Sequence, residues 1–500
     1  MRSKKAFVNI LTSLLLQVIT ILCGLLIPRL IIQNFGSDVN GLISSITQFL
    51  GYITLLESGV GPVVKAALYK PISQKNNDEI KGILKASQRF FKKIAYIFVI
   101  YIVILCIFLP AVFGEQFDVW LTVSLIVIIS LSTFAEYFFG MTYRLYLEAE
   151  QKKYITSIIQ IATYVLNTIV VIVLIKIGAN IQIVKLASVF IYVLRPIIQN
   201  IYIKKKYNLN YNDVKEEYNL KQKWDGLAQH IAAVAHNNTD ITILTIFTNA
   251  KIVSVYSVYS LIISGIKNLI LSFISGIDAS FGSMIANGEK EHLKKSFNVY
   301  ELFYFSVITI IYTATLLLII PFVQVYTNGI TDTNYIVPAF AYIIVIAEMI
   351  WSLRQPYNEL VKAAGHFKQT QIGAWVEVGT NIIISIVLVI KFGMVGVAIG
   401  TLIAMIIRTI EFILYTSKNM LGRSPMIAFR RFMVVAIQVI IVVILSRLIP
   451  DMSEISYIAW IIYAIEIVLL VSLVVLSTNL IIYKEDRKEL INLVKHIIKK

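Results

Sequence analysis

The sequence between His230 and Asn249, HIAAVAHNNTDITILTIFTN, is long enough to cross a bilayer as a helix, yet its first half is polar. Its polar residues are His230, His236, Asn237, Asn238, Thr239 and Asp240. An ionisable group in hydrocarbon costs about 2.5–3.5 kcal/mol, so Asp240 is expected to face a partner or a water-filled cavity. His236 and Asp240 are four residues apart on one helix face, but two ligands do not make a metal site. A hydrogen-bonded stripe or a proton-linked pair is expected instead.

Other charged residues also lie inside apolar segments. The basic ones considered are Arg29, Arg195, Lys267 and Arg408, and the acidic ones are Glu57, Glu136, Asp240, Asp278, Glu301, Glu348, Glu377, Glu411 and Glu466. One interpretation is structural: Arg408 and Glu411 share a helix face, and Lys267 lies near Asp278 along one segment. In that case these residues hold helices together.

The other interpretation is functional and concerns cations without a local acid. Arg29 follows Pro28, and its nearest acid in sequence is Asp38, whereas Arg195 has no acid within one helical turn. Unpaired cations facing a cavity would attract an anion, and arginine suits bidentate contact with phosphate. The sequence therefore favours a phosphate-bearing amphiphile as ligand.

The elements that position these residues follow from composition. Hydrophobic residues make up 58% of the 500 residues, mean hydropathy is +0.78, and apolar runs of about 20 residues recur throughout. These values predict a polytopic all-α membrane protein. Cys23 and Cys106 lie in separate apolar segments, so neither a disulfide nor a zinc site is expected. The apolar run 7–32 is too long for a signal peptide and is predicted to be the first membrane helix.

About fourteen membrane spans are predicted. They are 7–32, 41–64, 94–113, 119–140, 154–176, 181–203, 227–248, 252–283, 298–325, 335–355, 371–391, 394–416, 432–449 and 457–482. If both termini and every second gap lie on one side, that side holds 35 of the 45 Lys and Arg residues and the other side holds 4. By the positive-inside rule both termini are expected to be cytoplasmic. The net charge of +16 therefore reflects membrane topology and does not indicate a nucleic-acid partner.

An internal repeat divides the chain. Ala149, Lys176 and Gly178 recur 215 residues later as Ala364, Lys391 and Gly393, and Arg195 and Arg408 fall at nearly equivalent depths. Two pseudo-symmetric six-helix lobes are predicted, at 1–203 and 227–417, joined by an inter-lobe linker at 204–226. A C-terminal helix pair with a basic tail follows at 418–500. Parallel repeats of this kind are a known transporter plan, in which the substrate site lies between the halves.

Catalysis is not indicated by the sequence. It has no P-loop, G-x-S-x-G or H-E-x-x-H motif, and no predicted external gap exceeds about ten residues. A membrane glycosyltransferase or polymerase would need a larger external domain. We therefore expect neither an enzyme nor a cofactor.

Four stretches carry a family resemblance. They are PRLIIQNFGSDVNGLIS, LLESGVGPVVKAALY, YRLYLEAEQKKY and NNTDITILTIFTNAKIVSVYSVYSL. The chain resembles the polysaccharide-transporter family of O-antigen and capsule repeat-unit flippases, within the multidrug/oligosaccharidyl-lipid/polysaccharide exporter superfamily. The resemblance implies two six-helix lobes around a central cavity, alternating access, and translocation of an undecaprenyl-diphosphate-linked oligosaccharide to the outer leaflet. It also implies that the family's cavity cations correspond best to Arg29 and Lys267.

The candidate site residues follow from both lines of reasoning. Substrate binding is assigned to Arg29, Arg195, Lys267, Arg408, Asn237, Asn238 and Thr239, and coupling to a proton or sodium ion is assigned to Asp240, Glu57 and Asp278. Asn237 and Thr239 could equally satisfy neighbouring helices. Two alternative functions stay open: a flippase for a lipid-linked peptidoglycan precursor, and a cation-coupled multidrug antiporter of the same fold.

Overall fold

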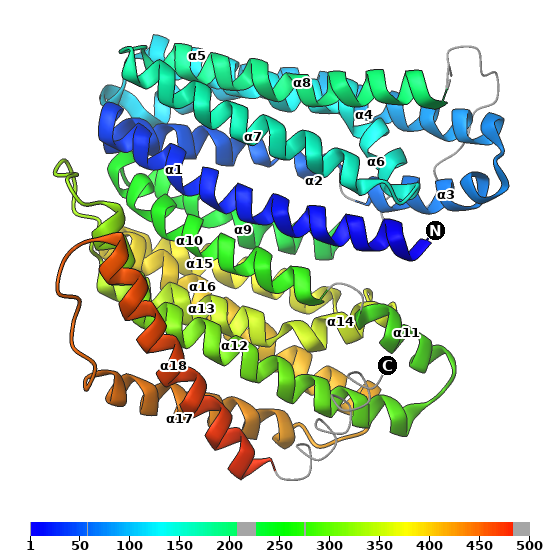
Figure 1. Cartoon of the computed structure of the whole chain (residues 1–500), viewed down its shortest axis with the longest axis vertical. Coiled ribbons are helices and arrows are strands. Elements are labelled where there is room, and N and C mark those ends of the chain that lie inside the picture. Colours follow the sequence, from blue (N-terminus) through cyan, green and yellow to red (C-terminus); the bar gives the residue numbers. More distant parts are fainter. Residues whose placement is uncertain (1, 58, 208–226, 275–276, 484–500) are drawn as a thin grey trace. The chain divides into compact units, whose positions relative to one another are not determined.

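All regular secondary structure in the described part of the chain is helical (Figure 1). The computed structural model describes residues 2–57, 59–207, 227–274 and 277–483, without the side chains of residues 2–7, 227–233, 235–237, 272–274 and 277–279. The chain separates into two compact units, Met1–Leu261 and Ile262–Lys500. The lobe boundaries expected from the sequence stay a prediction.

Eleven helices among the described residues are long and apolar enough to cross a membrane. Nearly all of the predicted span 7–32 and most of the predicted span 41–64 lie in one of these stretches, Val8–Glu57. There, α1 (Arg2–Gly51) continues across a kink at Gly36, whose φ of 88° is readily adopted only by glycine. The predicted span 335–355 corresponds mainly to α13 (Pro338–Leu353), whose 16 residues are fewer than the about 20 that a bilayer requires. The protein is therefore a multi-pass all-α membrane protein, as expected from the sequence.

The described part of unit 1 consists of ten helices and two short helical turns, and its last helix is shared with unit 2. They are α1 (Arg2–Gly51), α2 (Thr54–Glu57), α3 (Val60–Gln74), α4 (Asn77–Phe113), η1 (Gly114–Gln116), α5 (Val119–Ala135), η2 (Glu136–Gly140), α6 (Met141–Ala149), α7 (Lys153–Lys176), α8 (Ile181–Tyr207), α9 (Leu227–Phe247) and α10 (Ala250–Ile274). Within it, α1 packs on α7, α7 on α8, α8 on α5 and α5 on α4 (Figure 1). Helix α8 thus lies between α5 and α7.

Local sequence signals explain where two helices of unit 1 begin. The side chain of Asn76 accepts a hydrogen bond from the backbone N–H of Glu79 at 3.2 Å, so α4 starts at Asn77 and runs well beyond the predicted span 94–113. Asp118 caps α5 in the same way by accepting from the N–H of Leu121 at 3.3 Å. The hydropathy of the sequence marks the membrane segment, whereas the caps determine the helix ends.

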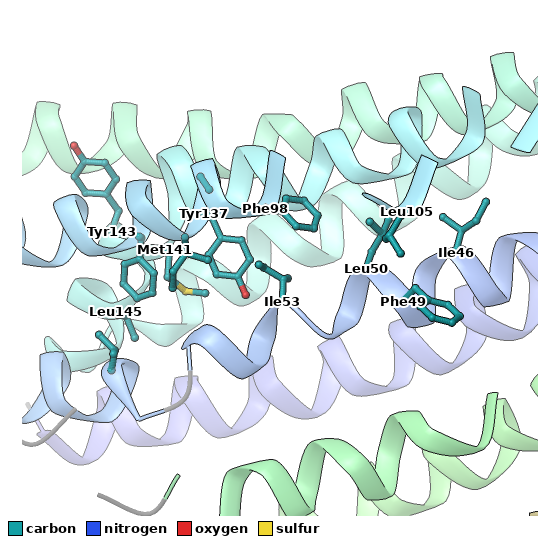
Figure 2. Packing of buried hydrophobic residues seen from close by; sticks show 14 of the residues in the cluster. Ile46, Phe49, Leu50, Ile53, Phe98, Leu105, Tyr137, Met141, Tyr143 and Leu145 are labelled. Atoms are coloured by element: carbon teal, nitrogen blue, oxygen red, sulfur yellow. The ribbon is translucent and has the colours of Figure 1, made fainter. Parts of the chain in front are cut away.

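Buried apolar side chains join α1, α4, α6 and the π-helical turn η2 of unit 1. Ile46, Leu50, Phe98, Leu105 and Tyr137 are among those in this core (Figure 2). The core fixes η2 against α4. This matters because η2 carries Glu136, which contributes to the site described below.

A glycine lets α8 approach η2 closely. A Cβ atom at Gly140 would lie 2.8 Å from Cβ of Pro196, which is shorter than real side chains allow. Pro196 directly follows Arg195 on α8. The contact therefore sets the distance between Arg195 and the residues of η2.

Unit 2 continues α10 and adds eight helices and one π-helical turn. They are α11 (Ile277–Ala286), α12 (Lys290–Tyr326), α13 (Pro338–Leu353), α14 (Gln355–Ala363), α15 (Gln371–Phe392), α16 (Met394–Thr416), η3 (Ser417–Leu421), α17 (Met426–Ser446) and α18 (Tyr457–Ile482). Helix α16 packs on α13 and α15. The C-terminal pair α17 and α18 packs on α12, with Gln438 donating to Thr478 at 2.6 Å and Asn479 donating to Ser306 at 2.8 Å.

The repeated segments form the same local structure in both units. Lys176 ends α7, and Gly178 follows with a φ of 78° before α8 begins. Lys391 lies in the last turn of α15, and Gly393 follows with a φ of 55° before α16 begins. The helix–turn–helix arrangement predicted from the repeat is confirmed.

Candidate functional site

One face of α8 carries polar residues at helical spacing. Lys185, Ser188, Tyr192, Arg195 and Gln199 are three or four residues apart, so they form a single stripe along the helix. All five line cavities within unit 1. The stripe is therefore the centre of the candidate site.

Two adjoining cavities flank this stripe. The lysine cavity, of about 420 Å³, is lined by Ile27, Thr47, Leu50, Gly51, Ile53, Thr54, Ile129, Ser132, Thr133, Asn167, Lys185, Ser188, Val189 and Tyr192. The arginine cavity, of about 360 Å³, is lined by Thr54, Glu57, Ser132, Thr133, Glu136, Tyr137, Met141, Arg144, Gln160, Tyr192, Arg195 and Gln199. Because four residues line both cavities, the two form a continuous polar region.

Among the described residues that line the lysine cavity, Lys185 is the only charged one. It is half-buried, and within the described ranges no carboxylate lies at ion-pair distance from its Nζ atom. Sequence reasoning missed this residue. The available signal was a lysine in an apolar run with no acid in the neighbouring turns.

Arg195 is held by neutral groups. Its Nε donates to Thr163 Oγ1 at 2.7 Å, and its guanidinium carbon lies 4.5 Å and 4.3 Å from the ring centroids of Tyr164 and Tyr192. Its Nη2 atom is buried and has no hydrogen-bond partner among the described residues. The structure thus agrees with the expectation that Arg195 lacks a nearby acid partner.

Both acids of the arginine cavity contact other side chains. Arg144 Nη1 lies 3.2 Å from Glu136 Oε1, and the Tyr137 hydroxyl donates to Glu57 Oε2 at 3.0 Å. Arg144 also lies 3.9 Å from Glu148. The two carboxylates and the two guanidinium groups in the described lining of this cavity therefore have a net formal charge of zero.

The polar stretch of α9 contacts the second half of α1 within unit 1. Gln48 donates to the side chain of Asn238, the Tyr52 hydroxyl lies 2.8 Å from Thr242 Oγ1, and Asp240 accepts from Tyr256 at 2.9 Å. Asp240 is 4% exposed, so the expectation that it faces a partner is confirmed. Asn238 therefore contacts a neighbouring segment of unit 1, whereas the same alternative for Asn237 and Thr239 stays a prediction.

Four other predicted residues are placed only in part. Thr239 is buried in α9, whereas the side chains of Asn237 and Asp278 lie outside the described residues. Arg29 is half-buried in α1. Their roles in binding or coupling stay predictions.

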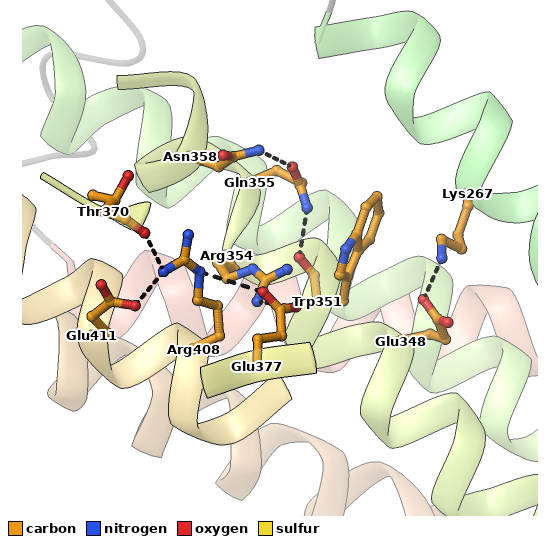
Figure 3. Close-up of polar contacts among 10 residues, drawn as sticks. All are labelled: Lys267, Glu348, Trp351, Arg354, Gln355, Asn358, Thr370, Glu377, Arg408 and Glu411. Atoms are coloured by element: carbon orange, nitrogen blue, oxygen red, sulfur yellow. Dashed lines mark hydrogen bonds and ion pairs between the residues drawn. The ribbon is translucent and has the colours of Figure 1, made fainter. Parts of the chain in front are cut away.

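The two predicted cations of unit 2 are neutralised by acids (Figure 3). Lys267 Nζ lies 2.9 Å from Glu348 Oε2 and 4.3 Å from the Trp351 ring centroid. Arg408 pairs with Glu411, as the structural interpretation predicted, and its Nε lies 3.3 Å from Glu377 Oε2. Both cations therefore have acid partners, and their assignment to substrate binding stays a prediction.

A further arginine completes this network. Arg354 Nη1 donates to Glu377 Oε1 at 3.0 Å, and Arg408 Nη1 donates to the carbonyl oxygen of Thr370 at 2.9 Å (Figure 3). The side chains of Arg354, Glu377 and Arg408 are all buried. The network fastens α13 and α14 to α15 and α16.

Comparisons with solved structures place this geometry in a known fold. The inward closed conformation of the lipid II flippase MurJ matches with a TM-score of 0.66 at 16% identity, covering 94% of this chain and 98% of that one. The fold is that of the MOP superfamily. An inward-facing multidrug resistance MATE family transporter of the MOP superfamily matches with a TM-score of 0.56 at 16% identity, covering 82% of this chain and 98% of that one. The eukaryotic MATE transporter AtDTX14 matches with a TM-score of 0.57 at 13% identity, covering 83% and 95%.

The sequence itself matches no family model and no curated relative. The similarity to MurJ and the MATE transporters is therefore a similarity of fold. It confirms the all-α membrane fold that the sequence predicted.

Proposed function

We propose that the protein is a transporter that flips an undecaprenyl-diphosphate-linked oligosaccharide repeat unit from the inner to the outer leaflet by alternating access, for cell-surface polysaccharide biosynthesis. The observation that carries this proposal is Lys185, a half-buried cation in a membrane helix, which lines a cavity with no acid among its described lining residues. A cation within a membrane is energetically costly without a counter-charge, so the presence of Lys185 at this position favours an anionic ligand.

The ligand chemistry follows from how phosphate is bound. A diphosphate that enters a partly dehydrated cavity loses hydration, which fixed donors must replace, and each charge-assisted hydrogen bond contributes about 1.5–3 kcal/mol. Lys185 provides three such donors to the diphosphate, and Arg195, farther along α8, offers a planar fork with an unpartnered Nη2 to another part of the same cargo. Arg29 is retained as a proposed third cation of the same ligand site.

A lipid-linked peptidoglycan precursor is the nearest alternative cargo. The similarity to the lipid II flippase MurJ, which extends over 94% of the chain, favours it. Both cargoes present a lipid diphosphate, so the cations on α8 would serve either. The discriminating measurement is which of two conditional strains, one lacking a repeat-unit flippase and one lacking a peptidoglycan-precursor flippase, the gene rescues.

A cation-coupled multidrug antiporter is the second alternative, and the MATE structures favour it. Such a protein needs an acid for the coupling ion. Asp240 and Glu57 are proposed for coupling to a proton or sodium ion, each accepting a hydrogen bond from a tyrosine. Gradient-dependent transport of a cationic dye that survives Lys185→Ala would favour this alternative.

Complementation tests the proposal. Lys185→Ala should reduce rescue of a repeat-unit flippase mutant by about tenfold to a hundredfold, since it removes the charge-assisted bonds to the diphosphate. Lys176→Ala is the matched control, because Lys176 is exposed at the end of the neighbouring α7. Full rescue by Lys185→Ala, at equal levels of protein in the membrane, would reject the anionic-cargo mechanism.

We also propose that both termini are cytoplasmic. Cysteines introduced at the exposed residues Ser73 and Ser424 should then be protected from a membrane-impermeant maleimide in intact cells, whereas one at the exposed residue Asp332 should be labelled. Ser37 is 0% exposed and is therefore unsuitable as an external reporter, although its sequence position suggested it. Labelling of Ser73Cys from outside would reverse the proposed orientation.

A further inference from the structure

The arginine cavity differs from the lysine cavity in its charge. Its lining contains two carboxylates and two guanidinium groups, with Arg144 and Glu136 at ion-pair distance. A multiply charged anion gains little electrostatic attraction from equal numbers of positive and negative side chains, and Glu57 and Glu136 repel it. The diphosphate is therefore better accommodated beside Lys185 than here.

Three buried polar atoms on the residues lining this cavity have no hydrogen-bond partner among the described residues. They are Gln199 Oε1, Arg195 Nη2 and Arg144 Nε, the last of which lies 3.9 Å from Glu148 Oε1, beyond hydrogen-bond distance; the Gln199 side chain is only 1% exposed. A buried polar atom without a partner costs free energy, which a ligand or an ordered water bound in this cavity would recover. The three atoms comprise one acceptor and two donors.

This mixture identifies the chemistry of the ligand. A phosphate oxygen can only accept, so it would satisfy the two arginines but not Gln199 Oε1. A sugar hydroxyl both donates and accepts, as serine and threonine hydroxyls do. The cavity also includes Tyr137 and Tyr192, which provide the apolar surface that small-molecule pockets usually have.

The spacing along α8 relates the two cavities. Lys185 and Arg195 are ten residues apart, which corresponds to about 15 Å along a helix at 1.5 Å per residue. This separation is longer than a diphosphate group. The residues between them that line the cavities, Ser188, Val189 and Tyr192, are all uncharged, and two of the three are polar.

We infer that the arginine cavity is a sugar-binding subsite, in which Gln199, Arg195 and Arg144 bind hydroxyl groups of the sugar that follows the diphosphate. The inference rests on the proposed function, because the lipid diphosphate of the same molecule lies beside Lys185. It assigns sugar recognition to α8 in addition to the polar residues of α9.

Binding of three lipids by the full-length protein in nanodiscs tests the subsite. The probes are undecaprenyl diphosphate, and the same lipid carrying one hexose or one N-acetylhexosamine, each titrated by native mass spectrometry. The wild-type protein should bind at least one glycosylated lipid about tenfold more tightly than the bare lipid. Gln199→Leu should reduce this ratio to near one without changing the affinity for the bare lipid, because it removes a sugar contact alone.

Two further variants keep the test independent of folding. Gln160→Leu, which alters another neutral residue of the same lining, should also lower the ratio. Asn200→Leu is the matched control: its amide oxygen is also buried and unpartnered, but the residue does not line the cavity, so the ratio should stay at the wild-type value. Lys185→Ala should weaken binding of all the lipids by the same factor.

The outcomes separate the inference from the function on which it rests. Equal affinity of the wild-type protein for bare and glycosylated lipids, or a ratio unchanged in both Gln199→Leu and Gln160→Leu, would overturn the subsite and leave the transporter proposal standing. If no lipid diphosphate binds, the proposed function fails together with the inference.

Discussion

The α7–α8 hairpin of unit 1 and the α15–α16 hairpin of unit 2 share a plan but treat their arginines differently. In both, an asparagine on the first helix donates to the second: Asn167 to Tyr192 at 2.9 Å, and Asn381 to Thr401 at 3.0 Å. In unit 1, Arg195 Nε meets the neutral hydroxyl of Thr163, whereas in unit 2, Arg408 Nε meets the carboxylate of Glu377.

The comparison indicates that the residue of the first helix opposite the arginine determines whether its charge is compensated within the protein. With a carboxylate opposite it, Arg408 is neutralised and becomes part of a buried ion-pair network that holds helices together. With a hydroxyl opposite it, Arg195 keeps its charge and one free donor at the wall of a cavity. The two helical hairpins thus place a structural arginine, Arg408, in unit 2 and a candidate ligand-binding arginine, Arg195, in unit 1.

The largest expected effect comes from breaking the network of unit 2. Glu377→Ala would leave Arg354 and Arg408 buried with one carboxylate fewer, and loss of one partner of a buried pair costs about 3–5 kcal/mol. The thermal unfolding midpoint of the purified protein should fall accordingly. Lys362→Ala is the control, because its pair with Glu359 is half exposed and contributes at most about 1 kcal/mol. Equal stability of the two variants would show that the ion-pair network of Arg354, Glu377 and Arg408 does not stabilise the fold.

A smaller effect is expected from a steric change beside the same network. A Cβ at Gly373 would lie 1.6 Å from Glu411 Oε2 and 2.1 Å from Arg408 Nη1, so Gly373→Ala must displace this ion pair. Overpacking of this kind costs about 1–3 kcal/mol, again measured by thermal unfolding.

Gly379 on the same helix provides the matched control for that measurement. A Cβ at Gly379 meets nothing within 4 Å, so Gly379→Ala should be neutral or slightly stabilising. If both alanine variants behaved alike, the close approach at Gly373 would not matter for the network.

The smallest change in free energy is expected from a variant that gives Arg195 of unit 1 the environment of Arg408 in unit 2. Thr163→Glu gives Arg195 the carboxylate that Arg408 has, so it should lower flipping of the lipid-linked glycan about tenfold, equivalent to about 1.4 kcal/mol. Thr163→Gln keeps the size without the charge and should be much milder. Equal loss in both variants would mean that space, and not the charge of Arg195, governs transport.

The α-helical membrane class, the positions of most spans and the repeat could be predicted from the sequence because they depend on local properties. Apolar runs identify helices in lipid, and Lys176–Gly178 and Lys391–Gly393 mark the same turn twice. Arg408 with Glu411 was also predictable, since three residues along a helix bring side chains together.

Other features depended on which helices pack together. Lys185 and Arg195 were equally isolated from acids in the sequence, yet the sequence could not show that both line cavities beside α5 and α7. Gly140 needs no special role in its own helix, and its importance appears only when Pro196 of α8 approaches it.

By itself, the sequence of this protein determined that the chain forms membrane helices, because hydropathy, caps and turn glycines act within a few residues. The tertiary structure decided which charges are neutralised. Lys267 pairs with Glu348 of α13, Arg354 pairs with Glu377 at a separation of 23 residues, and Arg195 meets Thr163 at a separation of 32. Coulomb and hydrogen-bond energies depend on distances in space, which helix packing sets and which the order of residues along one helix does not contain.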